Sequence, residues 1–209
     1  MSTRSCTQLV TTETRNLCDR CRKPLSVCYC HLIKRQNNHW PVEIVQHSRE
    51  PRHAIGTSRI AELSLSSINV SEARDNTPFI PDLAQSAPWE NAVLIYPGAD
   101  SQDICELADQ APRPLVFIDG TWRKSKAILL GSPFLQSLPR YSFKPGQQPR
   151  YRIRKAAQPD FYSTLEAIVK VLNSVEAAPA DYSQLLDVMD WMIEQQLGYI
   201  SGENPLPST

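Results

Sequence analysis

Asp119 is the residue of this sequence whose type and position best fit a role in catalysis or ligand binding. The apolar residues 115–118 lead directly into Asp119 and Gly120, and Thr121 then opens a helical pattern. Such a run predicts a buried strand that brings a carboxylate to the mouth of an α/β sheet, where ligands of open sheets bind. Two structural alternatives stand beside this one. Asp119 could be a turn residue, because Asp-Gly is a common turn pair, or an additional cap of the following helix.

The expected role of Asp119 is to accept a hydrogen bond and to orient a nucleophile. A helix N-terminus and nearby cations favour a charged carboxylate, and this makes it a weaker base. Assistance in proton removal is the alternative role. Trp122, which follows closely, is more often a core residue than a ligand contact on residue statistics. At this position it could both pack the helix and border a ligand.

Four cysteines have the spacing of metal ligands: Cys18, Cys21, Cys28 and Cys30. Thiolates are soft ligands, and four of them can close a tetrahedral zinc site that has no open coordination position. His31 is the substitute ligand if one cysteine points away. The alternative is a set of free buried or redox-active cysteines. We expect structural zinc, because the surrounding segment has almost no apolar core of its own.

Basic residues are concentrated around Asp119. Between residues 113 and 155 there are ten Lys or Arg side chains, and Asp119 is the single acid. Residues 156–209 hold one Lys and eight acids, although the formal net charge of the whole chain is zero. A concentrated positive field attracts a polyanion even when the molecule is neutral, so we expect RNA binding. The alternative is that these side chains only keep a face soluble.

Composition and length bound the remaining possibilities. With 209 residues the chain can hold one substantial core and a small accessory module. We expect no membrane segment and no signal peptide, and a soluble, cytoplasmic protein whose thiols stay reduced. The expected organisation is a disordered tail over 1–16, a zinc knuckle over 17–40, an α/β catalytic domain over 41–200 and a second tail over 201–209.

Periodicity predicts an α/β fold with a mostly parallel sheet. The runs 92–96 and 114–118 are continuously apolar, as in parallel strands that are covered on both faces. The other expected elements are strands over 42–47, 67–70 and 141–143 and helices over 55–65, 102–111, 121–130, 163–172 and 181–197. Strands that alternate with helices in this way indicate βαβ units.

Several common nucleotide sites are absent from the sequence. It contains no Gly-x-Gly-x-x-Gly and no Walker loop, and it lacks the paired motifs of a zinc deaminase. The pair His47 and Glu50 could serve acid–base chemistry or form a hydrogen-bonded structural pair.

Together, these motifs resemble the DTW-domain family of tRNA-uridine aminocarboxypropyltransferases. The resemblance covers most of residues 17–175 and rests on the cysteines and Asp-Gly-Thr-Trp, together with His47-x-x-Glu50, Gly56-Thr57-Ser58-Arg59, Leu94-Ile95-Tyr96-Pro97-Gly98, Ser132-Pro133, Leu138-Pro139-Arg140, Tyr151-Arg152-Ile153-Arg154 and Ser163-Thr164-Leu165-Glu166-Ala167. The resemblance implies a Ser ahead of the Tyr-Arg element, where this chain has Pro149 and Arg150. The family resemblance also implies a SPOUT-like fold with a C-terminal trefoil knot.

The resemblance implies a reaction. The enzyme would transfer the 3-amino-3-carboxypropyl group of S-adenosylmethionine to N3 of a uridine in tRNA and release methylthioadenosine. The catalytic residues would be Asp119 and Trp122. Cofactor contacts would come from Pro97, Gly98, Thr121, Trp122, Leu138, Pro139 and Arg140. The candidate phosphate contacts are Arg123, Lys124, Lys126, Arg150, Arg152, Arg154 and Lys155.

Two other functions fit the same pattern. One is an S-adenosylmethionine-dependent RNA methyltransferase of the same fold class. The other is a zinc-knuckle protein that binds RNA without catalysis. The sequence leaves the oligomeric state open between a monomer and a homodimer.

Overall fold

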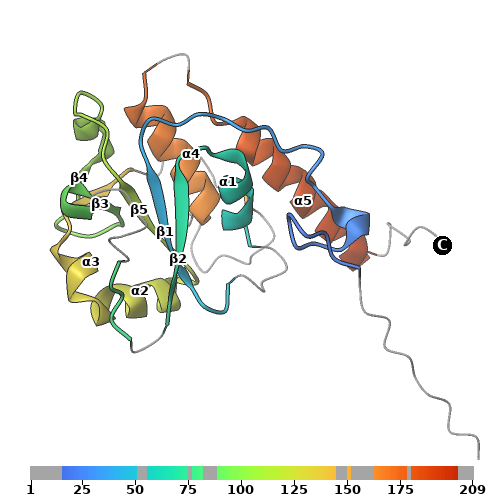
Figure 1. Cartoon of the computed structure of the whole chain (residues 1–209), viewed down its shortest axis with the longest axis horizontal. Helices are drawn as coiled ribbons and strands as arrows, with labels where there is room; N and C mark the ends of the chain where they lie inside the picture. Colours follow the sequence, from blue (N-terminus) through green and yellow to red (C-terminus); the bar gives the residue numbers. More distant parts are fainter. Residues whose placement is uncertain are drawn as a thin grey trace, which may run out of the picture.

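A computed structural model describes residues 16–50, 56–74, 77–81, 89–144, 150–151, 162–177 and 180–201. Its strands form one six-stranded sheet in which every described pair runs parallel. The strands are β1 (Val42–His47), β2 (Ile68–Ala73), β3 (Val93–Ile95), β4 (Gln102–Asp103), β5 (Leu115–Asp119) and β6 (Arg140–Ser142). Their order across the sheet is β2-β1-β5-β3-β6-β4 (Figure 1). The expected α/β fold with a mostly parallel sheet is confirmed.

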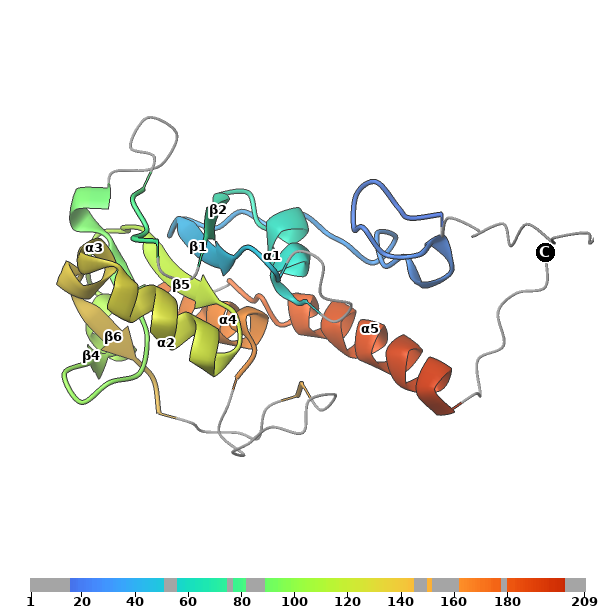
Figure 2. The same cartoon turned by 90° about the horizontal axis from the view of Figure 1, so that it is seen from below.

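Helices cover both faces of this sheet. The α-helices are α1 (Ser58–Ser64), α2 (Trp122–Gly131), α3 (Pro133–Ser137), α4 (Thr164–Val175) and α5 (Gln184–Ser201), and the 3₁₀ helices are η1 (Leu25–Val27), η2 (Trp89–Asn91) and η3 (Ile104–Leu107). Helices α1, α4 and α5 pack against one another on one face, while α2 and α3 lie together on the other face (Figures 1 and 2). None of the helices that the structure describes is both long and apolar enough to cross a membrane.

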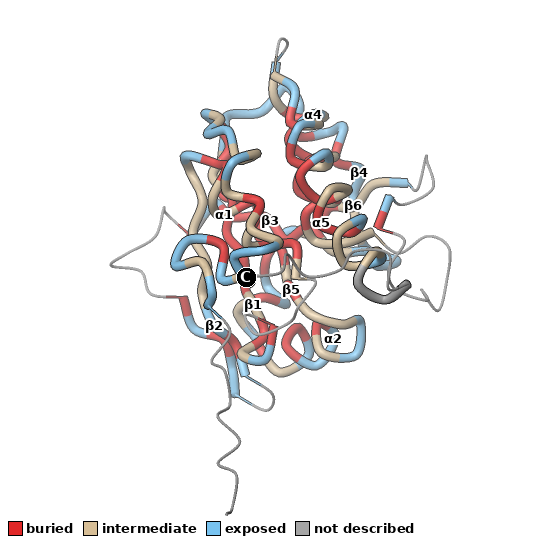
Figure 3. The backbone as a smooth tube through the Cα atoms, turned by 90° about the vertical axis from the view of Figure 1, so that its right-hand side faces the viewer, coloured by how far each residue is buried: buried red, intermediate tan, exposed pale blue. Residues whose placement is uncertain are grey.

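The continuous apolar run of β5 is explained by burial on both of its sides. Leu115 and Phe117 belong to the core cluster on the side of α4, and Val116 belongs to the cluster on the side of α2. Figure 3 shows the buried residues concentrated in the central strands and in the helix faces turned toward them. Because alternate residues point to opposite faces, Asp119 shares the α4 side with Leu115 and Phe117.

Helices α2 and α4 begin where their local capping signals predict. The Thr121 hydroxyl accepts a hydrogen bond from the backbone N–H of Lys124 at 3.4 Å. Ser163 and Glu166 form the predicted capping box, in which each side chain accepts from the backbone N–H of the other. A capping box satisfies two N–H groups that the first helical turn leaves without helical partners. The start of each helix is therefore encoded locally.

Two elements differ from the expectation. The predicted helix over 102–111 is instead the short strand β4 followed by η3. The Asp103 carboxylate caps η3 by accepting from the Cys105 backbone N–H, so the helical part begins only at Ile104. Helix α3 was not expected, although Ser132 as N-cap and Pro133 as first residue are typical signals of a helix start. Of the expected tails, residues 1–15 and 202–209 lie outside the described residues.

The cysteine knuckle, residues 17–40, packs onto the helices of one face. Cys21 and Tyr29 are buried in the same core cluster as α1, α4 and α5. The guanidinium of Arg59 in α1 donates from Nε to the backbone oxygen of Arg20 at 2.8 Å. The ring of His31 meets Trp191 of α5 edge to face, with centroids 5.4 Å apart. The knuckle and the sheet domain thus share one apolar core.

Candidate functional site

The connections that leave the neighbouring parallel strands β1 and β5 run in opposite directions across the sheet. The connection from β1 to β2 passes through α1 on one face, whereas the connection from β5 to β6 passes through α2 and α3 on the other. Strands β1 and β5 are neighbours, and Gln46 pairs with Asp119 in their register. Ligands of open parallel sheets bind outside the carboxyl ends of the strands at such a switch point. This topology places Asp119 where a ligand is expected.

Two neutral side chains hold the Asp119 carboxylate. Gln46 donates from Nε2 to Oδ2 at 2.8 Å, and Thr164 donates from Oγ1 to Oδ1 at 2.5 Å. The same Gln46 amide also donates to the hydroxyl of Ser58 at 2.7 Å. Asp119 is 8 % exposed, so its carboxylate lies near the surface but has little freedom. We call Asp119, Gln46, Ser58 and Thr164 the Asp119 site.

The Asp119 site joins the starts of three helices to the edge of the sheet. Ser58 is the first residue of α1, Thr164 is the first residue of α4, and Thr121, two residues after Asp119, caps α2. Helix N-termini carry partial positive charge and favour a nearby anion. None of the hydrogen bonds described for Asp119 goes to the backbone of α2, so this geometry does not resemble a helix cap.

Several of the predicted RNA contacts already have acidic partners. Lys124 pairs with the buried Glu50 at 2.9 Å. Arg150 pairs with Asp187 at 3.1 Å and also with Asp190, both on α5. Arg123 and Lys126 are exposed on α2, and Arg152, Arg154 and Lys155 lie outside the described residues. The positive excess along the sequence is thus partly neutralised by acids from other segments.

The predicted cofactor residues divide between the carboxyl ends and the amino ends of the parallel strands. We call the side of the sheet where the carboxyl ends and Asp119 lie the Asp119 edge. Pro97 and Gly98 follow the carboxyl end of β3, at the same edge as Asp119 and Thr121. Leu138 and Pro139 precede β6, so they lie at the amino end of that strand, and Leu138 is buried in the core. Because β3 and β6 are parallel, the structure does not bring these two residues to the Asp119 edge.

Two further cofactor residues reach toward that edge. The Nη1 atom of Arg140 lies 2.7 Å from where a Cβ on Gly98 would stand, so only glycine fits there without a shift. The same guanidinium group is held by Asp100 at 2.9 Å. The Trp122 side chain is 39 % exposed, and its ring lies edge to face with Tyr96 at 5.9 Å. Trp122 therefore presents aromatic surface beside Asp119.

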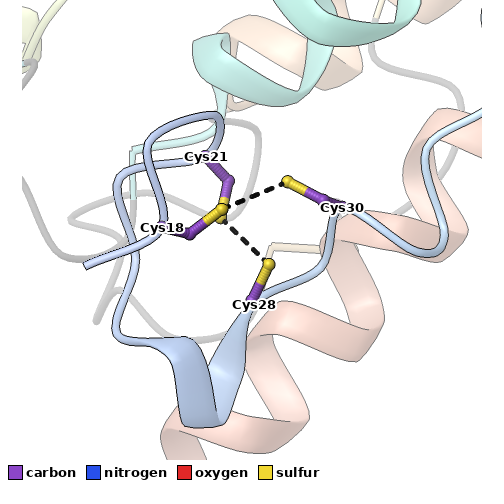
Figure 4. Close-up of side chains that lie close together, drawn as sticks. All are labelled: Cys18, Cys21, Cys28 and Cys30. Atoms are coloured by element: carbon purple, nitrogen blue, oxygen red, sulfur yellow. Dashed lines mark hydrogen bonds between the residues drawn. The ribbon is translucent and has the colours of Figure 1, made fainter. Parts of the chain in front are cut away.

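The four predicted metal ligands converge. Figure 4 shows the side chains of Cys18, Cys21, Cys28 and Cys30 pointing toward one another. Their Sγ atoms all lie within 4.8 Å of one another. The Cys18–Cys30 and Cys21–Cys28 sulfur pairs are each separated by 3.7 Å. A tetrahedral zinc with bonds of about 2.3 Å holds its sulfur atoms roughly 3.8 Å apart, so the donor set fits this ion.

The local backbone supports a thiolate at Cys18. The backbone N–H groups of Cys21 and Arg20 lower the pKa of the Cys18 thiol to about 6, because they donate hydrogen bonds to the charged sulfur. The turn is closed by the backbone N–H of Arg22, which donates to the Cys18 oxygen at 2.8 Å. Arg22 has a φ of 60°, in the left-handed region that a residue with a Cβ seldom occupies.

The sequence did not predict that Gln46 and Thr164 bind Asp119, or that Ser58 binds Gln46. Each of these residues lies within a predicted strand, helix or motif, but no local pattern predicts which distant side chain it contacts. The relevant information is the register of β1 against β5 and the position of the first turn of α4. His47 and Glu50, expected as one pair, differ in their partners. Glu50 binds Lys124, and His47 Nδ1 accepts from the backbone N–H of Arg49.

A parallel α/β sheet joined to a four-cysteine module is the class of protein that this architecture defines. The chain belongs to the DTW domain family, whose model matches residues 15–197. It is 28 % identical over 190 residues to tRNA-uridine aminocarboxypropyltransferase 2 of Drosophila melanogaster, which covers 88 % of this chain and 76 % of the relative. It is 25 % identical over 179 residues to the Mus musculus protein of the same name, with 78 % and 58 % covered.

A third relative is a plant protein. The chain is 23 % identical over 225 residues to tRNA-uridine aminocarboxypropyltransferase A of Arabidopsis thaliana, which covers 92 % of this chain and 85 % of the relative. No solved structure matches the chain. The chain spans little more than half the length of the mouse relative.

Proposed function

We propose that this chain is a tRNA-uridine aminocarboxypropyltransferase, which transfers the 3-amino-3-carboxypropyl group of S-adenosylmethionine to N3 of a uridine in tRNA. Membership of the DTW domain family and the names of the three relatives support the reaction class. The observation that carries the proposal is the placement of Asp119 at the switch point of the sheet.

The second substrate, S-adenosylmethionine, supplies a methylene carbon that is activated by the attached positive sulfur. The uridine N3 attacks that carbon, the new N–C bond forms as the C–S bond breaks, and the electron pair of the C–S bond stays on sulfur. The N3 proton is released to water and methylthioadenosine leaves. Because N3 lies on the Watson–Crick edge, the target base must be unpaired.

Asp119 orients the base in this proposal. A carboxylate has about four acceptor positions, and the hydrogen bonds from Gln46 and Thr164 use two. One of the remaining positions accepts a hydrogen bond from the uracil N3–H. Gln46 and Thr164 fix the plane of the carboxylate before the substrate binds, so alignment of the attacking atom costs little at the moment of reaction.

The proposed S-adenosylmethionine contacts centre on the Asp119 edge. Pro97, Gly98, Thr121 and the exposed ring of Trp122 lie at this edge, and Arg140 reaches it beside Gly98. Leu138 and Pro139 would contribute only from the far end of β6. The C-terminal trefoil knot that the family resemblance implies belongs to the same proposal.

The proposed RNA surface lies on α2. Arg123 and Lys126 are exposed at i, i+3 spacing and therefore share a helix face, next to Trp122 at the start of the helix. Cations paired with phosphates make binding fall steeply with salt. Arg152, Arg154 and Lys155 remain predicted contacts. The proposed compartment is the cytoplasm, where tRNA is available and thiols stay reduced.

The cysteine knuckle would hold a structural zinc, with residues 17–40 and 41–200 as the two functional units. Four thiolates leave no open position for a substrate on the metal. The role of Cys18, Cys21, Cys28 and Cys30 would then be to fold the segment and dock it on α1 and α5. The proposed chemistry needs no metal, since positive sulfur is already a good leaving group.

Product analysis tests the proposal. Purified protein is incubated with tRNA and S-adenosylmethionine, and both the digested nucleosides and the small product are examined by mass spectrometry. Methylthioadenosine together with an N3-modified uridine is the expected result. S-adenosylhomocysteine would instead identify a methyltransferase of the same fold class. Salt-sensitive tRNA binding with unchanged nucleosides would identify a zinc-knuckle RNA-binding protein.

A further inference from the structure

One buried carboxylate ties a separate segment to the start of α4. Glu166 is 4 % exposed. Its Oε1 accepts from the backbone N–H groups of Arg150 and Tyr151, at 2.6 and 3.2 Å, and its Oε2 accepts from the backbone N–H of Ser163 at 2.7 Å. A capping box requires only the last of these three hydrogen bonds. The other two attach the Arg150–Tyr151 segment to the first turn of α4.

The side chains of this segment are attached as well. The guanidinium of Arg150 binds Asp187 and Asp190 of α5, and the Tyr151 side chain is buried in the core cluster that includes α4 and α5. A guanidinium between two carboxylates already has its charge compensated. Both carboxylates bind Nη2 of Arg150, so a phosphate that approaches this guanidinium would be repelled by the negative charges of Asp187 and Asp190 beside it.

The attachment lies next to the Asp119 site. Ser163, whose N–H binds Glu166, is followed directly by Thr164, whose hydroxyl donates to Asp119 at 2.5 Å. The Ser163 hydroxyl also contacts the sulfur of Met189 on α5 at 3.7 Å. The position of the Thr164 hydroxyl thus depends on how the first turn of α4 is held between Arg150–Tyr151 and α5.

We infer that Arg150, Glu166, Asp187 and Asp190 form a clamp that positions Thr164 on the Asp119 carboxylate, and that Arg150 is a positioning residue that does not contact RNA. We call these four residues the Arg150 clamp. It deepens the proposed function, on which its catalytic consequence rests.

The two roles of Arg150 predict opposite effects when its acidic partners are removed. If Arg150 belongs to the clamp, the variants Arg150→Gln and Asp187→Asn/Asp190→Asn loosen the same contact. Each then lowers kcat by about tenfold, because a misplaced catalytic group slows the reaction without changing RNA affinity. Combining them adds little, since residues of one network are not additive. If Arg150 contacts phosphate, removing the acids frees it and tRNA binds more tightly, whereas Arg150→Gln binds more weakly.

Three controls make these measurements specific. The double variant Glu106→Gln/Asp109→Asn removes two exposed acids elsewhere, which corrects tRNA affinity for the change in net charge. Arg123→Gln removes a proposed phosphate contact and is expected to lower the salt dependence of tRNA binding. Arg150→Lys keeps the charge and is expected to restore part of kcat. Glu166→Gln would place an amide against N–H donors and disrupt the helix cap, so it is less informative.

Amide hydrogen exchange supplies a readout that needs no activity. We expect faster exchange in the first turn of α4 for Arg150→Gln and for Asp187→Asn/Asp190→Asn, and no change for the Glu106→Gln/Asp109→Asn control. Unchanged exchange, or tighter tRNA binding on removal of the acids beyond that of the control, would overturn the clamp. If the wild-type protein has no transferase activity but exchange behaves as expected, the proposed function fails and the structural clamp stands.

Discussion

The cysteine cluster and the Asp119 site are assembled over different distances along the chain. All four cysteines lie between residues 18 and 30, and one short turn brings the first two together. The partners of Asp119 are 73 residues away in the case of Gln46 and 45 residues away in the case of Thr164. The first arrangement is a property of a local segment, whereas the second exists only when β1, β5 and α4 are packed.

The two regions therefore differ in the interactions that hold their side chains in place. A metal ion held by the four thiols would add its binding energy to the apolar contacts that the knuckle makes with the core, because such binding energy becomes folding energy. The Asp119 site depends on the parallel register of β1 and β5 and on the first turn of α4, which bring two neutral donors to the carboxylate. We therefore expect substitutions in the knuckle to be measured mainly as stability and substitutions at the Asp119 site mainly as turnover.

Cys21→Ser gives the largest expected effect. Cys21 is buried in the core cluster shared with α1 and α5, and loss of one thiolate opens the tetrahedral site. We expect loss of bound zinc and a fall of more than about 3 kcal/mol in the free energy of unfolding. Metal analysis and denaturant unfolding measure both, and Cys105→Ser, at an exposed cysteine, is the control. A stable, metal-free Cys21→Ser protein would show that these cysteines are not ligands.

Asp119→Asn is the corresponding change at the other region. The amide retains hydrogen-bonding capacity toward Gln46 and Thr164, so the free energy of unfolding should change by only about 1 kcal/mol. Turnover should fall by about 100-fold or more, since the charged acceptor proposed to align the uracil N3–H is lost. Single-turnover kinetics and tRNA binding test this, with Asp109→Asn as the exposed control. Unchanged turnover would remove Asp119 from the site.

Thr164→Val sharpens the comparison with a smaller effect. The substitution keeps the shape of the side chain and removes the hydroxyl that donates to Asp119. We expect turnover to fall by about tenfold, which corresponds to one lost hydrogen bond to a charged group. Thr164→Ser keeps the donor and should stay close to wild type. Equal turnover in the valine and serine variants would mean that this hydrogen bond does not orient the carboxylate.

Arg22→Gly is expected to have the smallest effect and the opposite sign. Arg22 has a φ of 60°, which glycine adopts without the steric cost that a Cβ brings. We expect the free energy of unfolding to rise by about 1 kcal/mol, with zinc retained. Lys34→Gly, at an exposed knuckle residue outside the left-handed region, should instead be neutral or destabilising. A loss of stability in Arg22→Gly would indicate that its side chain contributes more than its backbone costs.

Local signals predicted the local features of the molecule. The cysteine spacing identified all four converging thiols, the Ser163 and Glu166 pair identified the start of α4, and the apolar runs identified β3 and β5. Strand β4 gave no signal because both of its residues are exposed and neither face has an apolar pattern. Helix α3 begins with a clear cap but is only one turn long, too short for a periodic pattern.

Contacts between distant segments could not be predicted in this way. Counting charges along the sequence gave a strongly basic central stretch, yet Glu50, Asp100 and Asp187 compensate three of its cations in the folded chain. The capping box predicted that Glu166 binds Ser163 and gave no indication that it also binds Arg150 and Tyr151. The resemblance to the DTW family supplied the reaction class, which no local pattern in the chain encodes.

The packing of the knuckle against α5 sets an order on biosynthesis. The ribosome makes the cysteines first, and Trp191, which contacts His31, emerges after more than 150 further residues. At cellular elongation rates this takes on the order of ten seconds. During that interval the nascent thiols cannot yet pack against α5. A metal ion bound early by the emerging segment would protect them from oxidation until α5 is made.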